Sequence, residues 1–312
     1  MNEINNLALL STLIAATLSA GTPMLLAGLG LLVNERAGVV NLGAEGMMLL
    51  AAVAGFALAL ATGSDALALA GGALAGALAA LLFGWFAIYL NTNQYATGLA
   101  LSLFGGGLSA FVGIDYVSRN LPRVPLTGIP WLSDLPWFGP ALFRQHWAVY
   151  LALLLALLIG VFLQRSRAGL ALRAVGESPE SAHALGLPVR RVRLAAVCFG
   201  GACCGLAGAY LSVIYTPMWV EGMVAGRGWI ALALTPFATW RASRVVIGAY
   251  LFGGVTLLQF HLQSIGVEIA SALLSMLPYL ATVLVLALIS RNPAWIQRNM
   301  PASLGRPFTP GQ

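Results

Sequence analysis

The chain has 312 residues, of which 59% are hydrophobic and only 8% are charged, whereas a soluble domain carries about 25% charged residues. This composition excludes an ordinary soluble protein and predicts an integral membrane protein. All sixteen basic residues are arginine. Without lysine, the chain cannot contain a phosphate-binding loop of the G-x-x-x-x-G-K-[ST] type. If the protein takes part in ATP-driven transport, the ATPase is therefore another chain.

The formal net charge of +6 has a simple interpretation, because arginines fix the topology of membrane proteins on the cytoplasmic side. Nucleic-acid binding needs a contiguous basic face, which the sequence lacks. The three cysteines, Cys198, Cys203 and Cys204, share one apolar run without the spacing of a disulfide framework or a zinc site, and we interpret them as small core residues. No metal site is expected, and the N-terminus lacks the basic region of a cleavable signal.

The first predicted span is the uncharged run 4–34, in which Pro23 and neighbouring glycines predict a kinked or broken helix. The stretch 34–46 that follows is polar and places Glu45 close to the start of the second span, 46–64. Charged residues in a membrane are usually buried in protein or line a cavity. This stretch is therefore a candidate functional segment.

The uncharged run 66–114 is long enough for two spans, with a hinge at the polar residues 91–94. Residues 114–147 follow as a loop that is too rich in proline for a span, and its tryptophans are typical of a membrane interface. We expect this loop on the periplasmic or extracellular side. The fifth span is predicted at 145–164.

Residues 164–193 form the longest strongly charged stretch, and the positive-inside rule predicts that it is cytoplasmic. Its arginines are Arg165, Arg167, Arg173, Arg190, Arg191 and Arg193. Ser178 can cap a helix that has Pro179 in its first position, and Gly186 can end it. The sequence therefore predicts a short helix over Pro179–Leu185. Such a helix is more than a connecting loop needs, and we hypothesise that another protein docks there.

The sixth span is predicted at 194–220. It contains Gly201-x-x-x-Gly205, and the third span contains Gly72-x-x-x-Gly76. Both spacings allow close helix contact, and we favour packing within the bundle over a specific dimer face.

The run 228–240 is short for a membrane crossing, so it is expected to be broken or re-entrant. The positions of the later arginines favour a full crossing. Spans at 245–267 and 269–290 complete nine crossings (eight to ten), with the N-terminus outside and residues 291–312 as a cytoplasmic tail. The predicted fold is thus an all-α, polytopic transmembrane helix bundle that forms a single transmembrane domain over 1–312.

A family resemblance is carried by GLGLLVNERAGVVNLGAEGMMLL at 28–50 and by the stretches 173–209 and 225–234. These resemble permease subunits of the branched-chain amino acid, simple-sugar and nucleoside class of ABC importers. The Glu-Arg-x-Gly-Val-x-Asn-x-Gly-x-Glu-Gly-Met-Met string is typical of the nucleoside-type branch. The stretch 235–240 departs from the family pattern, which has an aliphatic run containing Phe-Gly there, so the wall that it forms is expected to differ.

The resemblance implies a type II-like importer permease with broken helices in the cytoplasmic (inner) membrane of a bacterium. It implies three kinds of partner: ATPase subunits that use ATP and Mg, a second permease that is homologous or identical, and an extracytoplasmic substrate-binding protein. The chain itself would bind no cofactor and would not be an enzyme. The short helix would be the coupling helix that contacts the ATPase. Its contact residues would be Glu177, Ser178, Pro179, Glu180, Ala182, Gly186 and Leu187.

For the translocation path we nominate polar residues near the breaks in the apolar runs. They are Asn34, Glu35, Asn41, Glu45, Asn91, Asn93 and Gln94. Amide side chains donate and accept hydrogen bonds, which suits the base edges and hydroxyl groups of a nucleoside. A structural interpretation remains open, in which Glu35 pairs with Arg36 and Glu45 lies at a helix N-terminus.

Several functions remain open at this point. Within the same class of importer, the solute is most consistent with a nucleoside or a purine-type compound, with a simple sugar, a branched-chain amino acid or a flavin as alternatives. An ion-coupled secondary transporter would need an intramembrane proton or ion relay, and the few acidic residues lie mostly at span ends. An integral membrane enzyme would need a catalytic cluster, and the sequence contains no such motif.

Overall fold

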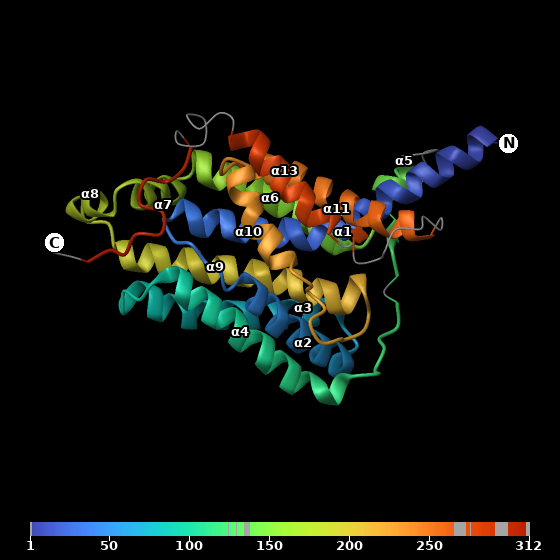
Figure 1. Cartoon of the computed structure of the whole chain (residues 1–312), viewed down its shortest axis with the longest axis horizontal. Helices are drawn as coiled ribbons and strands as arrows, with labels where there is room; N and C mark the ends of the chain where they lie inside the picture. Colours follow the sequence, from blue (N-terminus) through green and yellow to red (C-terminus); the bar gives the residue numbers. More distant parts are fainter. Residues whose placement is uncertain are drawn as a thin grey trace.

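The computed structural model describes residues 2–123, 125–128, 130–133, 138–264, 273–274, 276–290 and 299–309. Long helices lie side by side along one direction (Figure 1). The N-terminus lies at one end of the bundle, and the helices α7 and α8 lie with the C-terminus at the other, here called the α8 end (Figure 1).

The described elements follow one another along the chain. They are α1 (Asn2–Arg36), α2 (Ala44–Thr62), α3 (Asp65–Gly84), η1 (Trp85–Tyr89), α4 (Gln94–Gly113), η2 (Ile114–Tyr116), β1 (Thr127–Gly128), α5 (Phe138–Leu142), β2 (Arg144–Gln145), α6 (Trp147–Arg165), α7 (Arg167–Glu177), α8 (Pro179–Ala184), α9 (Val189–Tyr210), η3 (Leu211–Tyr215), α10 (Arg227–Phe237), α11 (Ala242–Ser264) and α13 (Leu277–Ser290). Apart from the two-residue antiparallel pair β1–β2, the described elements are helical, which confirms the predicted all-α class.

Within the described residues, seven helices are long and apolar enough to cross a membrane, so the protein is a multi-pass membrane protein. They correspond to the first six predicted spans and the eighth. The seventh predicted span is the shorter helix α10. The ninth is represented by α13, and its predicted start at 269–272 lies outside the described residues, as do 291–298 of the predicted tail.

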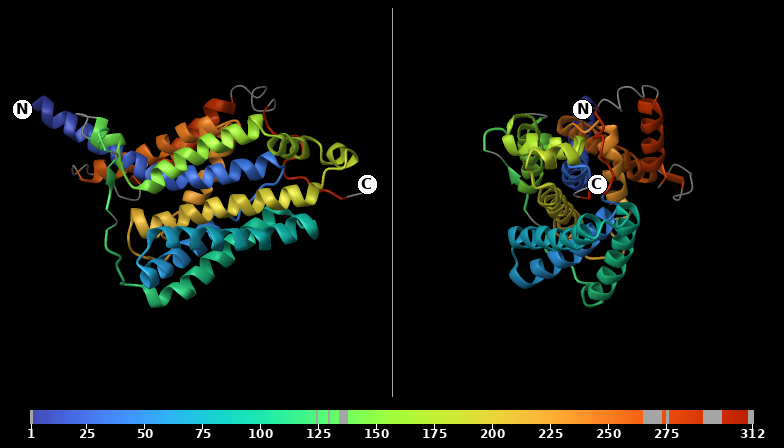
Figure 2. Two further views of the ribbon diagram at one scale, coloured as in Figure 1. Left: turned by 180° about the vertical axis from the view of Figure 1, so that it is seen from behind. Right: turned by 90° about the vertical axis from the view of Figure 1, so that its left-hand side faces the viewer.

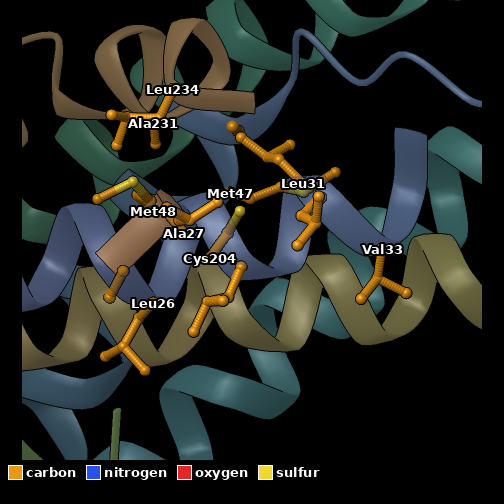
Figure 3. Packing of buried hydrophobic residues seen from close by; sticks show 14 of the residues in the cluster. Leu26, Ala27, Leu31, Val33, Met47, Met48, Cys204, Ala231 and Leu234 are labelled. Atoms are coloured by element: carbon orange, nitrogen blue, oxygen red, sulfur yellow. The ribbon is translucent and has the colours of Figure 1, made fainter. Parts of the chain in front are cut away.

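The core forms where α1 and α9, the two most deeply buried spans, pack against each other. Figure 3 shows Leu26 and Leu31 of α1 beside Cys204 of α9, with Met47 of α2 and Leu234 of α10 completing the cluster. All five side chains are buried. The cysteine agrees with the predicted role of a small core residue, and the neighbouring Cys203 is buried as well.

The two glycine motifs pack against each other within the chain, α3 on α9. A Cβ placed on Gly76 would meet the Gly205 Cα at 2.7 Å and the Gly201 carbonyl, and a Cβ on Gly72 would meet the Gly205 carbonyl at 3.0 Å. The helix backbones therefore touch at these positions, as small residues permit in membranes. This confirms the prediction of packing within the bundle.

We expect Gly76→Ala to destabilise the protein by about 1–3 kcal/mol, the usual cost of overpacking a close contact. Gly107→Ala is the matched control, because a Cβ at Gly107 meets nothing within 4 Å. The midpoint of thermal unfolding of the purified protein in detergent measures both changes. Equal midpoints for the two variants would refute the close contact between α3 and α9.

The first span is continuous, although Pro23 predicted a kink or a break. A proline offers no N–H to the carbonyl four residues earlier, which here belongs to Ser19. The hydroxyl of Tyr210 on α9 donates to that carbonyl at 3.2 Å. A neighbouring helix thus satisfies the backbone group that the proline leaves free, as is required within lipid.

The breaks lie elsewhere in the chain, at 37–43 between α1 and α2 and at 216–226 between η3 and α10. Each is a non-helical segment next to a membrane helix, which lipid tolerates only where protein or a cavity surrounds it. The second break makes α10 short, in agreement with the broken seventh span predicted from 228–240.

The charged stretch 164–193 contains two helices. The predicted one is present as α8, with the Ser178 Oγ accepting from the Ser181 N–H at 3.2 Å and Pro179 in the first position. Gly186 follows with a φ of +83°, a backbone conformation that favours glycine. α7 has no counterpart among the predicted elements. Its start is capped by the hydroxyl of Ser166, which lies 2.8 Å from the Gly169 N–H.

Candidate functional site

The two breaks meet inside the bundle, at the start of α2 and the start of α10. Glu45, in the first turn of α2, accepts hydrogen bonds from the N–H groups of Gly226 and Gly228, both at 2.8 Å. A Cβ on Gly228 would meet the Glu45 Cα at 2.7 Å. The carboxylate therefore closes the N-terminus of a helix that is distant in sequence, where free N–H groups and the helix dipole favour an anion.

The two helices leave this meeting point in opposite directions. α10 leads to Trp240, whose carbonyl accepts from the Arg36 guanidinium at the C-terminal end of α1. α2 leads to Asp65 at the start of α3, which accepts from His146 at 2.9 Å and Trp147 at 2.7 Å near the start of α6. The full span α2 and the shorter helix α10 therefore meet with their N-termini together at the level of Glu45.

Glu35 holds the other end of α10. Its carboxylate accepts from the hydroxyl of Thr235 and from the indole N–H of Trp240, each at 2.6 Å, and the side chain is buried. Both donors come from the stretch 235–240. Glu35 thus pairs with α10 rather than with the adjacent Arg36, so α10 lies between two carboxylates.

The extended segment 37–43 is held by α4. The Gln94 Oε1 accepts from the Val40 N–H at 2.9 Å, and the Ser102 hydroxyl donates to the Leu42 carbonyl at 2.8 Å. Gly98 brings α4 close, since a Cβ there would meet the Leu42 N at 2.7 Å. Without a helical ladder of its own, this segment depends on such side-chain partners.

Asn41 stabilises the turn at the end of this segment. Its Oδ1 accepts from the Gly43 N–H at 2.9 Å, and its amide N lies 3.6 Å from the sulfur of Met47. The side chain is fully buried. An asparagine that bonds two residues ahead forms an Asx turn, which sets the entry into α2.

Asn34 differs from these residues, because its buried amide has no hydrogen-bond partner within the part of the chain that the structure describes. It lies against Gly200 of α9, where a Cβ would collide with the amide. Buried polar groups without partners are rare and costly, so Asn34 is a candidate for contact with solute or water.

Asn91 and Asn93 lie apart from this cluster, at the α3–α4 turn. The Asn93 Oδ1 caps α4 by accepting from Tyr95 and Ala96 at 2.9 and 3.1 Å. Asn91 has a φ of +50° and a buried Oδ1 that lacks a partner among the described residues. Of the nominated path residues, Glu35, Asn41, Glu45 and Gln94 are therefore brought together around the two breaks.

The coupling set divides between two faces of α8. Pro179 and Ala182 are buried, the latter against Val175, Val189 and Phe308. The outward-facing members of the set are Glu177, Glu180 and Gly186. Neighbouring residues that also face outward, but were not in the predicted set, are Ser181, His183, Ala184 and Leu185. Ser178 and Leu187 are half-buried. Any partner would therefore meet the second face, with Pro179 and Ala182 supporting it from within.

Sequence reasoning missed the distant partners of these residues, among them Thr235, Trp240, Gly226, Gly228 and Ser102. The spacing Gly226-x-Gly228 before an apolar helix was a usable signal, because it permits close backbone approach. Within the described part of the chain, no group of three or more His, Cys, Asp or Glu side chains is placed to hold a metal ion.

Comparison with known proteins gives a family over most of the chain. Residues 13–289 match the family described as branched-chain amino acid transport system / permease component. A Haloferax volcanii protein provisionally assigned as glucose ABC transporter permease TsgC13 is 39% identical, covering 94% of this chain and 95% of its own length.

Other relatives are named for nucleosides, and two of them cover nearly the whole chain. The nucleoside ABC transporter permease NupC of Lactococcus lactis subsp. cremoris is 32% identical over 92% of this chain and 94% of its own length. The guanosine ABC transporter permease NupQ of Bacillus subtilis is 30% identical over 97% of this chain and 98% of its own length. No solved structure gives a significant match.

Proposed function

The chain belongs to the family of branched-chain amino acid transport system permease components, and we propose that it forms the translocation path of an ABC importer for a nucleoside or related purine-type solute, together with a second permease. The observation that carries this proposal is the full-length similarity to permeases named for nucleosides and guanosine. A family of permease subunits leaves ATP hydrolysis, with its Mg, to separate ATPases, and it implies an external binding protein that delivers the solute.

The site chemistry supports a neutral polar solute. Around the two breaks, the carboxylates of Glu35 and Glu45 are occupied by N–H and O–H donors of the chain itself. At the first break, the buried amide of Asn34 has no partner among the described residues. Amides both donate and accept, as hydroxyls and base edges require.

A simple sugar is the second candidate, favoured by the relative provisionally assigned to glucose. Sugars and nucleosides share hydroxyl groups that an amide can contact. A nucleoside differs from a simple sugar in carrying a planar base. The base requires additional space or an aromatic surface in the path.

The distribution of arginines supports an inward-facing α8 end. Arginines at this end include Arg165, Arg167, Arg173, Arg190, Arg191, Arg193, Arg241 and Arg244. The opposite end has Arg119, Arg123 and Arg144 in or next to its loops. From the positive-inside rule we infer that the α8 end is cytoplasmic, with the ATPases meeting α8 and the C-terminus inside.

Uptake by the reconstituted complex tests the function. With the second permease, the ATPases and the binding protein in proteoliposomes, we expect ATP-dependent uptake of labelled guanosine that unlabelled glucose and leucine do not compete away. Competition by glucose alone would move the assignment to a sugar. Uptake that continues without ATPases or ATP would contradict an ABC importer and favour an ion-coupled transporter.

A further inference from the structure

The C-terminal segment 299–309 lies at the α8 end (Figure 2), where it contacts α7, α8, α9 and the segment 37–43. Ser303 contacts the last turn of α7: its N–H and its hydroxyl both donate to the Gly176 carbonyl, at 3.0 and 2.7 Å. The Ala302 N–H lies 3.4 Å from a carboxylate oxygen of Glu177. The tail thus begins its path on the helix that leads directly into α8.

Arg193 joins the tail to the start of the first break. Its Nη2 donates to the Ser303 hydroxyl at 3.1 Å and its Nη1 to the Arg306 carbonyl at 3.0 Å. Its Nε donates to the Ala37 carbonyl at 3.2 Å. The side chain is only 2% exposed, and these three acceptors are neutral. The planar fork of an arginine fixes such partners at defined angles.

The tail also contacts the extended segment itself. The Gly305 N–H donates to the Gly38 carbonyl at 3.1 Å, and Gly38 has a φ of +85°. The backbone of 37–43 is bonded to the flanking helices at its two ends, through Ala37 N–H to the Val33 carbonyl and Met47 N–H to the Gly43 carbonyl. Between these ends, the contact with the tail and those from α4 hold its path. The tail therefore touches the segment that leads to Asn41 and Glu45.

The far end of the tail packs beneath α8. Phe308 is 5% exposed and lies in a cluster with Val175, Ala182 and Val189. The His183 ring meets it edge-on, with centroids 5.5 Å apart. The inward face of α8 therefore rests on the tail, while its outward face is free of the chain.

From these contacts we propose that the C-terminal tail and Arg193 are positioning elements that transmit movement of α8 to the extended segment 37–43. This inference rests on the proposed function, in which the ATPases move α8. The tail is hydrogen-bonded to the segment at one point and packed against α8 at another, so displacing α8 shifts both. The segment in turn positions Glu45, and with it the start of α10.

A second route exists and must be separated from the tail. Gly176 packs directly against the backbones of Arg36 and Gly38, since a Cβ there would meet the Gly38 N at 3.3 Å. If that contact sufficed, variants of the tail would leave transport unchanged. The experiment therefore changes the tail and leaves Gly176 intact.

The primary variant is Ser303→Ala, which removes the hydroxyl shared by Gly176 and Arg193. Phe308→Ala is the second variant, because it acts at the other end of the tail. Ser109→Ala is the matched control: Ser109 is also buried, and among the described residues its hydroxyl bonds the Gly106 carbonyl, at 2.9 Å, on α4 and away from the tail. All are studied in the complete complex.

Two measurements decide the outcome: the ATP hydrolysed per solute imported, and hydrogen exchange of the amides of 37–43 and 178–187 with and without ATP. We expect both variants to bind the ATPases. They should hydrolyse at least about five times more ATP per imported solute, an effect of about 1 kcal/mol. ATP should no longer alter hydrogen exchange at 37–43, while its effect at 178–187 should persist. The Ser109→Ala complex should match the wild type.

Wild-type stoichiometry with an intact response at 37–43 in both variants would overturn the role of the tail. Loss of ATPase binding in both variants would also overturn the proposal, because the tail would then be part of the docking surface and not a link to 37–43. A wild-type chain that binds no ATPase refutes the proposed function itself, so the two failures are distinguishable.

Discussion

Replacing Glu45 by glutamine is expected to reduce solute uptake about tenfold or more, the equivalent of 1.4 kcal/mol. The two carboxylate oxygens accept the N–H groups of Gly226 and Gly228. Glutamine has the same shape as glutamate but only one accepting oxygen. Its NH2 group would face the N–H of Gly226 or Gly228, from which it cannot accept a hydrogen bond. Leaving a buried donor unsatisfied costs about 1–3 kcal/mol, so the start of α10 should shift or fray.

The control is Glu221→Gln, since Glu221 is an exposed acid in the second break, and its uptake should match the wild type. Glu45→Asp keeps the charge but withdraws the oxygens, and intermediate uptake is expected. Uptake and the thermal midpoint of the purified chain are measured for all three. A Glu45→Gln variant with wild-type values for both would show that the carboxylate does not hold the starts of α2 and α10 together.

Much of the fold could be predicted because membrane spans and caps are local signals. The uncharged runs gave the positions of α3 and α4 on either side of the turn at 91–94. Ser178, Pro179 and Gly186 gave α8, because capping chemistry involves residues only a few positions apart. The glycine spacing predicted close packing, although only the structure shows that α3 and α9 are the partners.

The site was only partly predictable, because its contacts join distant parts of the chain. Glu35 and Glu45 were identified as unusual, yet their partners lie about 180–205 positions away along the chain. The helix α7 was not predicted, because the arginines in its sequence indicated a charged cytoplasmic loop. The role of Ser303 as a link between Gly176 and Arg193 has no local signal in the sequence.

Leu185→Asp is expected to remove coupling to the ATPases while leaving the permease folded. Leu185 follows α8 directly and is 82% exposed, and an exposed leucine beside polar residues on a short capped helix is typical of a docking contact. Burying a leucine side chain against a partner stabilises by about 1.5–3 kcal/mol. Aspartate loses this stabilisation and must also be desolvated.

We therefore expect ATPase binding to weaken about tenfold or more, which matches a loss of 1.4 kcal/mol or more. Because the side chain is exposed in the isolated chain, its thermal midpoint should stay unchanged. Affinity of the ATPases for the detergent-solubilised permease measures the first quantity, and solute-stimulated ATP hydrolysis measures its consequence. Leu185→Ala should lie between the wild type and the aspartate variant, since it loses the contact without adding a charge.

The matched control is Leu126→Asp, which places the same change on a leucine 66% exposed in the 114–147 loop. That loop connects η2 to α6 at the end of the bundle opposite α8. If α8 receives the ATPases, the control binds them normally. If Leu126→Asp loses the ATPases and Leu185→Asp retains them, the ATPases meet the opposite end, and the proposed orientation is reversed. A single pair of exposed leucines thus tests both the docking site and the topology, because the two ends of the bundle cannot both face the cytoplasm.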